Sequence, residues 1–193
     1  MSDPTRTSAP DPIGEIVPGQ PPVPITVWHV PAPARSQTMS LPMAQRLVAG
    51  FTHRHDLVLD LTTGPQLARA AMSARRRHRR HTAGGFDHPG EPAALLVTPW
   101  PPDRSQRPVE FLSVCAGRLQ PGGCVALVIA TGEVTIHQRL IAAGHAAGLT
   151  YLQHYIAAHQ LRLTGARLTI HEQHLRVHTD VVVLALPTDA EGG

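Results

Sequence analysis

Several things are scarce in this sequence, and each scarcity excludes a class of protein. Its 193 residues include only two cysteines, Cys115 and Cys124, which cannot build a disulfide framework and favour a reducing compartment. No apolar run approaches the roughly 18 residues that a membrane-spanning helix needs, and the N-terminus lacks the basic and apolar segments of a signal peptide. Aromatic residues make up 4%, so Leu, Val, Ala and Ile must build most of the core. We therefore expect a cytoplasmic protein without membrane contact.

Lysine is absent altogether, so all 17 basic residues are arginines, set against 14 acidic residues for a formal net charge of +3. The bias as a whole is most simply explained by a GC-rich genome, and the net charge alone says little about partners. One segment differs, because it concentrates five arginines around His78: Arg75, Arg76, Arg77, Arg79 and Arg80. Two interpretations stay open for it. It is either a solvated helix C-terminus, where cations are favoured, or a surface that contacts the phosphates of DNA or RNA.

What the chain does contain is a regular alternation of strand and helix patterns. Residues 1–24 are rich in Pro, Asp, Ser and Gly and are expected to form a disordered arm; residues 25–187 predict one domain, and 188–193 a flexible tail. The patterns predict strands at 25–30, 56–60, 82–87, 93–97, 124–130, 150–158 and 180–186, and helices at 43–51, 66–77, 109–119 and 133–147. This alternation indicates an α/β fold with a mostly parallel sheet, and the last two strands predict an antiparallel edge.

The most informative segment is residues 57–71. An apolar strand ends in Asp60, Thr62 and Gly64 form a tight turn, and Pro65 precedes the next predicted helix. In nucleotide-type cofactor loops this order places backbone N–H groups and a helix N-terminus against the ligand. The segment therefore predicts a cofactor site at the end of this strand.

Further motifs stand in a definite order around that loop. A proline-led helix at Pro42 precedes it, Asp87 follows it, and the strand at 93–97 runs into Thr98-Pro99-Trp100. Residues 118–123 form a Pro-Gly-Gly turn before the next strand. Taken together over roughly residues 25–187, this order resembles the class I S-adenosylmethionine-dependent methyltransferases. More narrowly, it resembles the group that methylates exocyclic amines of DNA bases (N6 of adenine or N4 of cytosine).

The resemblance implies a Rossmann-like methyltransferase fold, S-adenosylmethionine as the cofactor, and a role for each matching residue. The residues implied to bind the cofactor are Pro42, Asp60, Thr62, Gly64 and Asp87, with Asp87 at the ribose hydroxyls. The residues implied at the methyl acceptor are Thr98, Pro99 and Trp100. There the Thr98 side chain and the Pro99 carbonyl would hold the target amine, and Trp100 would stack on a flipped base.

The chain departs from the pattern of that family in three places. Pro65 and Gln66 stand where a small residue and a glycine would follow Gly64, and Thr98 stands where an acid or amide is usual. The residues between Asp87 and the strand at 93–97 leave no room for a third strand and its helix, so we expect a fold compacted by one such unit. Two functions stay open: an active methyltransferase, or a catalytically inactive methyltransferase-like binding or scaffold protein. A third interpretation is a nucleic-acid-binding protein that acts through its arginine-rich segment.

Thirteen histidines raise the question of a metal site. His171 and His174 are one residue too close together for the His-Glu-x-x-His pattern, in which both histidines share a helix face. His154, His159 and His178 have no cysteine at ligand spacing. From spacing alone, the sequence predicts no metal site.

Overall fold

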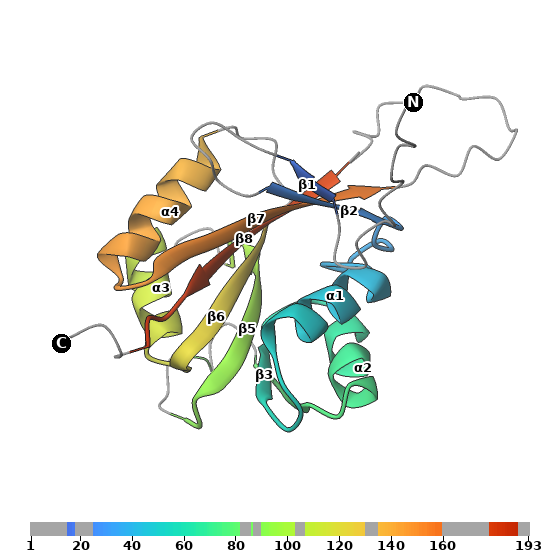
Figure 1. Ribbon diagram of the computed structural model, residues 1–193, viewed down its shortest axis with the longest axis horizontal. Coiled ribbons are helices and arrows are strands. Elements are labelled where there is room, and N and C mark those ends of the chain that lie inside the picture. Colours follow the sequence, from blue (N-terminus) through green and yellow to red (C-terminus); the bar gives the residue numbers. More distant parts are fainter. Residues whose placement is uncertain are drawn as a thin grey trace, which may run out of the picture.

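A mixed sheet of eight strands organises the chain in a computed structural model that describes residues 15–17, 25–81, 86, 90–102, 107–129, 135–159 and 178–188 (Figure 1). In chain order the strands are β1 (Glu15–Val17), β2 (Ile25–Val30), β3 (Leu57–Asp60), β4 (Arg77–Arg80), β5 (Ala93–Trp100), β6 (Leu119–Ile129), β7 (Thr150–His159) and β8 (His178–Ala185). The helices are α1 (Leu41–Phe51), α2 (Gln66–Ser73), α3 (Pro108–Ala116) and α4 (Ile136–Ala146).

The strands lie side by side in the order β1-β2-β7-β8-β6-β5-β3-β4. β4, β3, β5 and β6 pair in parallel with one another, and β2 pairs in parallel with β7, which confirms the mostly parallel α/β fold. β8 is antiparallel to both β6 and β7, so the last two strands do pair as predicted. β8 nevertheless lies inside the sheet, because β2 pairs with the outer side of β7, and the antiparallel edge is instead β1, which pairs with β2.

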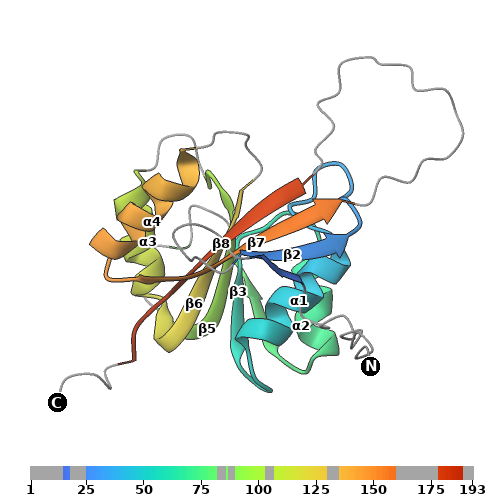
Figure 2. The same cartoon turned by 45° about the horizontal axis from the view of Figure 1, so that its top comes forward.

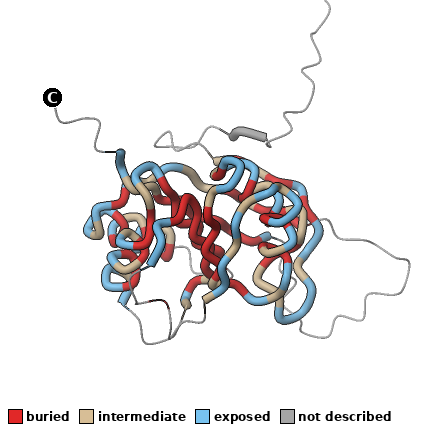
Figure 3. The backbone as a smooth tube through the Cα atoms, turned by 90° about the horizontal axis from the view of Figure 1, so that it is seen from below, coloured by how far each residue is buried: buried red, intermediate tan, exposed pale blue. Residues whose placement is uncertain are grey.

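Helices cover both faces of the sheet, as Figures 1 and 2 show: α1 and α2 pack on one face, and α3 and α4 on the other. Successive residues of the central strands therefore enter two different cores. In β8, Val181 and Val183 pack toward α1 and α2, whereas Val182 and Leu184 pack toward α3 and α4. Because both faces are covered, these strands need continuous apolar runs. Figure 3 shows the resulting band of buried backbone through the middle of the molecule.

The arginine-rich segment is a strand and not a helix end. α2 was predicted to continue to about residue 77 but ends at Ser73, and Arg75 adopts a positive φ of 55° that a continuing helix does not allow. The next residues turn back, and β4 then pairs in parallel with β3. The interpretation of this segment as a helix C-terminus is therefore wrong. β4 occupies the place beside β3 that was expected for a strand at 82–87; of those residues, all but Phe86 lie outside the described residues.

The predicted loss of one strand-helix unit agrees with the sheet order. No described residue between β4 and β5 belongs to a helix or strand, and β4 is the last strand on its side of the sheet. At the opposite edge, the segment expected to form a disordered arm contributes β1, while residues 1–14 and 18–24 lie outside the described residues. Among the described helices, none has both the length and the apolar character needed to cross a bilayer.

The turn that leads into the buried part of β6 requires a residue without a side chain. A Cβ on Gly123 would lie 2.7 Å from the Ala93 carbonyl oxygen and 2.8 Å from that of Gln120, so the backbone would have to move. We expect Gly123→Ala to lower the free energy of unfolding by about 1–3 kcal/mol, as overpacking does. Urea denaturation followed by circular dichroism measures this change.

Gly50 in α1 is the matched control, since a Cβ there would meet nothing within 4 Å. We expect Gly50→Ala to raise the free energy of unfolding by about 0.5–1 kcal/mol, because alanine loses less conformational entropy in a helix. Equal effects of the two substitutions would contradict the role assigned to Gly123.

Candidate active site

Asp60 anchors the turn at the carboxyl end of β3. Its side chain is fully buried, and its Oδ1 accepts hydrogen bonds from the Thr62 N–H at 2.8 Å and the Thr62 hydroxyl at 2.6 Å. Its Oδ2 lies 2.9 Å from Nε2 of His78 and 3.8 Å from Nε of Arg80. His78 and Arg80 are alternate residues of β4, so the parallel pairing of β3 and β4 brings both beside this carboxylate.

The surroundings of Asp60 favour its ionised form. Burial by itself raises the pKa of this carboxyl group, but the hydrogen bonds with His78 and Thr62 lower it by more. The net result is a pKa below the ordinary value for aspartate. Asp60 is therefore a charged acceptor that holds the turn in place.

The turn is also held from outside β3. The Thr38 hydroxyl accepts a hydrogen bond from the Thr63 N–H at 2.9 Å, and the Thr38 N–H donates to the Thr63 carbonyl at 3.2 Å. On the opposite side, the Arg80 guanidinium donates to the carbonyls of Thr62 and Gly64. The turn is thus fixed between β4 and the segment that leads into α1. Pro42 lies in the first turn of that helix, as predicted.

The end of the turn contains the residues that depart from the family pattern. Gly64 has a φ of 94°, which favours glycine, and a Cβ there would collide with the Gln66 side chain. Pro65 occupies the N-cap of α2 and supplies no N–H group. Among the described residues, the buried atoms Gln66 Oε1 and Ser40 Oγ make no hydrogen bond. These two atoms lie on the segments that the Thr38–Thr63 hydrogen bonds join.

The Thr98-Pro99-Trp100 segment reaches the same edge of the sheet as Asp60. Asp60 pairs with Val97 across β3 and β5, so these three residues lie just beyond it. Thr98 is fully buried, and its hydroxyl donates to the Pro99 carbonyl at 3.0 Å. Trp100 is 7% exposed and packs against Phe111 with ring centroids 5.9 Å apart. The structure thus places Asp60 and the turn after it at the same edge of the sheet as the three predicted acceptor residues, of which Pro99 is the most exposed.

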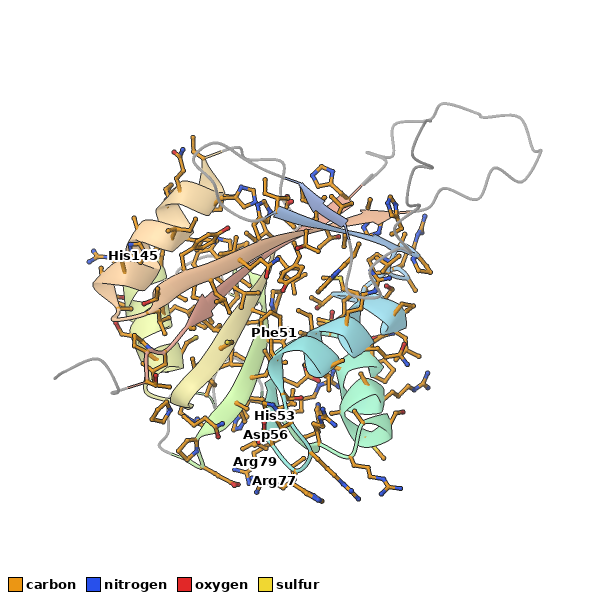
Figure 4. The ribbon with its side chains drawn as sticks, in the orientation of Figure 1. Phe51, His53, Asp56, Arg77, Arg79 and His145 are labelled. Carbon is orange, nitrogen blue, oxygen red and sulfur yellow. The ribbon has the colours of Figure 1, made fainter. Side chains whose placement is uncertain are left out.

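The remaining predicted site residues are divided. Arg76 turns inward and donates to the Thr52 hydroxyl and carbonyl, so it has a structural role. Arg77 and Arg79 lie on the outer edge of the sheet near His53 and Asp56 (Figure 4) and form ion pairs with Glu91 at 2.5 and 3.9 Å. Arg75 is exposed. Asp87 lies outside the described residues.

Sequence reasoning missed two groups of residues at this edge. His78 was counted only as part of the arginine-rich segment, and its contact with Asp60 requires the register of β4 on β3. His137, His154 and Asp180 come from α4, β7 and β8, yet their ligand atoms lie within 4.8 Å of one another. No spacing along the chain indicates this second group, because its members meet only through the sheet order.

Comparison with solved structures finds proteins with a similar architecture. A chain from the complex between the Haloferax volcanii Trm112 methyltransferase activator and its proposed methyltransferase matches with a TM-score of 0.52 and 15% identity, covering 76% of this chain and 88% of that one. The chain has the methyltransferase fold. A geranyl diphosphate C-methyltransferase from Streptomyces coelicolor, solved with Mg²⁺, geranyl diphosphate and S-adenosyl-L-homocysteine, matches with a TM-score of 0.50 and 10% identity over 75% of this chain and 80% of that one.

A proposed RNA methyltransferase from Pyrococcus horikoshii has the same fold, with a TM-score of 0.50 and 12% identity over 76% of this chain and 81% of that one. No protein-family model matches the sequence, and a comparison with curated proteins found no significant relative. At these identities the matches establish the methyltransferase fold, which the sequence motifs predicted, and nothing finer.

In this methyltransferase fold, Asp60→Asn tests the anchoring carboxylate. An amide accepts from the Thr62 N–H but does not pair with both His78 and Arg80, so we expect a loss of about 1–3 kcal/mol in the free energy of unfolding at pH 7. Because the pKa of Asp60 is lowered in the folded state, its contribution is complete above about pH 4, the ordinary value in an unfolded chain. It is lost as the pH falls through the lowered folded-state pKa. The difference between wild type and variant should therefore shrink in acid.

Denaturant unfolding at a series of pH values measures this difference, with Glu91→Gln as the control. Glu91 also pairs with arginines of β4, but its side chain is 40% exposed, so its removal should cost at most about 1 kcal/mol. A loss at Asp60 no larger than that at Glu91 would show that the buried carboxylate does not anchor the turn.

Proposed function

We propose that this protein binds S-adenosylmethionine at the turn after β3 and transfers its methyl group to an exocyclic amine of a nucleic-acid base. The observation that carries the proposal is the turn itself. Asp60, Thr62 and Gly64 form a fixed loop at the carboxyl end of a parallel strand, followed at once by the N-terminus of α2. In α/β folds, ligands bind at this position.

The residues present fit this cofactor. Ser40 Oγ and Gln66 Oε1 are buried polar atoms without hydrogen-bond partners among the described residues, and such atoms cost free energy unless a ligand pairs with them. Gln66 Oε1 can accept from an ammonium or amine group, and S-adenosylmethionine carries both. When bound, the cofactor supplies an electrophilic methyl group on a sulfonium; the chain has to hold and orient the two reactants.

The Pro99 carbonyl is the proposed hydrogen-bond acceptor that holds the target amine. It lies one strand away from the turn and is half-buried, and the Thr98 hydroxyl that donates to it fixes its position. A nucleic-acid substrate is supported by the arginines of β4 and by one neighbour with this fold, which is described as a proposed RNA methyltransferase. The proposal covers DNA and RNA alike.

Gly64→Ala tests cofactor binding. The substitution puts a Cβ onto the Gln66 side chain at a φ that alanine rarely adopts, so we expect the affinity for S-adenosylmethionine to fall at least about tenfold. Isothermal titration calorimetry measures it. Gly148→Ala is the matched control, because Gly148 also has a positive φ but lies after α4, where a Cβ would meet nothing within 4 Å. This control should leave the affinity unchanged. Absence of binding heat in a folded wild-type sample would overturn the proposal.

One observation, the burial of the Thr98 and Trp100 side chains, favours a second function. Thr98 is fully buried and Trp100 packs on Phe111, so neither side chain lies ready to contact a base. A catalytically inactive methyltransferase-like binding or scaffold protein would have this arrangement. Cofactor binding without transfer of a labelled methyl group to single-stranded DNA or RNA would identify this alternative.

Arg77 and Arg79 test the nucleic-acid partner. Both are exposed on the edge strand β4, and Glu91 neutralises only one of the two charges. If they bind phosphates, Arg77→Gln with Arg79→Gln should weaken binding of a single-stranded oligonucleotide and reduce its salt dependence. The log–log slope should fall by about 0.7 for each phosphate that is no longer neutralised. Fluorescence anisotropy at several salt concentrations measures both effects.

The control for this pair is Arg107→Gln with Arg139→Gln, which removes two exposed arginines next to and within the helices on the other face of the sheet. Its total charge change is the same. If both double variants weaken binding equally, the effect comes from net charge alone and the β4 surface does not bind the oligonucleotide.

A further inference from the structure

A group of polar side chains lies outside the turn and segment described above. His154 on β7 approaches Asp180 on β8, with 3.1 Å between its Nε2 and the Asp180 Oδ1. His137, in the first turn of α4, approaches the other oxygen, Oδ2, with its Nε2 at 3.5 Å. His178 Nε2 also lies 3.5 Å from Oδ2, on a side chain that is 55% exposed. Three imidazoles thus surround one largely buried carboxylate.

This group lies at the same edge of the sheet as the turn after β3. Asp180 pairs with Ile129, the last residue of β6, and with Ile156 of β7. Because β6 and β7 both run parallel to β3, their carboxyl ends share that edge. The sheet order places β8 beyond β6 and β5, so the group lies away from β3 on the side of the acceptor segment.

Hydrogen bonding explains this arrangement only in part. The 3.1 Å contact of His154 is an ordinary hydrogen bond, but 3.5 Å is longer than the usual N–H···O distance. The rings of His137 and His154 have centroids 4.7 Å apart, so two protonated imidazoles there would repel each other. Neutral imidazoles present nitrogen lone pairs instead.

The spacing of the ligand atoms fits a metal ion. Zinc binds histidine nitrogens and carboxylate oxygens at about 2.0–2.2 Å, which at a tetrahedral angle separates neighbouring ligand atoms by about 3.3 Å. The distances of 3.1 Å from His154 Nε2 to Oδ1 and 3.5 Å from His137 Nε2 to Oδ2 lie on either side of this value, and one ligand atom from each of the three residues lies within 4.8 Å of the others. An ion would bind both carboxylate oxygens, or one oxygen after a small rotation of the carboxylate.

We propose that His137, His154 and Asp180 form a binding site for a divalent transition metal, with zinc as the best fit. Two imidazoles and one carboxylate are a donor set for this class of ion and not for Mg²⁺ or Ca²⁺, which prefer oxygen ligands. Three protein ligands leave one coordination position open for water or a substrate oxygen. The site is independent of cofactor binding at the turn.

Zinc titration of the full-length protein, after dialysis against a chelator, tests the site. We expect one tight site per chain by calorimetry, which millimolar Mg²⁺ does not occupy. His154→Gln and Asp180→Asn should each weaken zinc binding at least about tenfold, since even the groups that only support metal ligands matter by that much. His145→Gln is the control: His145 is an exposed histidine at the other end of α4 (Figure 4) and should leave the affinity unchanged.

Thirteen histidines provide many weak sites, so the variants decide the outcome. The proposal is overturned if the wild type does not bind zinc, or if His154→Gln and Asp180→Asn bind zinc with the affinity of the wild type. Circular dichroism checks that each variant is folded. If Asp180→Asn does not fold, histidine ring signals in the NMR spectrum of the wild type decide instead. Zinc should shift the signals of His137 and His154 and not that of His145. Loss of S-adenosylmethionine binding in Gly64→Ala has no bearing on this result.

Discussion

The buried charge of Asp60 is the constraint on which the carboxyl edge of this sheet depends. A carboxylate without solvent contact is costly unless hydrogen bonds and opposite charges surround it. The turn supplies the Thr62 N–H and hydroxyl, and β4 supplies His78 and Arg80. The chain therefore has to bring a strand with the correct alternation alongside β3, and the shape of the turn follows from satisfying this one group. The arginine-rich segment thus has an internal role on one side of β4 and a solvent-facing side on the other.

Much of the fold could be predicted from the sequence, because strands covered on both faces need continuous apolar runs and the connecting helices show apolar residues at helical spacing. The end of α2 could not. Arginine and alanine are good helix formers, so residues 74–77 continue the helical pattern. The pairing of β4 with β3, which serves Asp60, overrides that local preference. Likewise, β8 lies inside the sheet because β2 pairs with β7, and no local sequence pattern predicts the pairing of two strands so far apart in the chain.

For the candidate site the same division holds. Asp60 and Gly64 were found because a strand, a turn and a helix follow one another within a few residues. Ser40 and Gln66 have no such signature, since what singles them out is that Ser40 Oγ and Gln66 Oε1 are buried without hydrogen-bond partners among the described residues. His137, His154 and Asp180 are more remote still. They lie close together because of the order of β6, β8 and β7 and the position of α4. Predicting this group therefore requires the topology of the sheet, which residue spacing along the chain does not give.

The pairing of β2 with β7 has a consequence for how the chain acquires its structure. Ile25 lies opposite His154, so the two strands join nearly the whole length of the domain. Contacts of such long range form slowly, because the entropy cost of closing a large loop comes before the favourable contacts that offset it. During synthesis β2 leaves the ribosome long before β7 exists, and its buried residues Trp28 and Val30 have no sheet to join. β2 therefore joins the sheet late, and in a growing chain its apolar residues need protection from other chains.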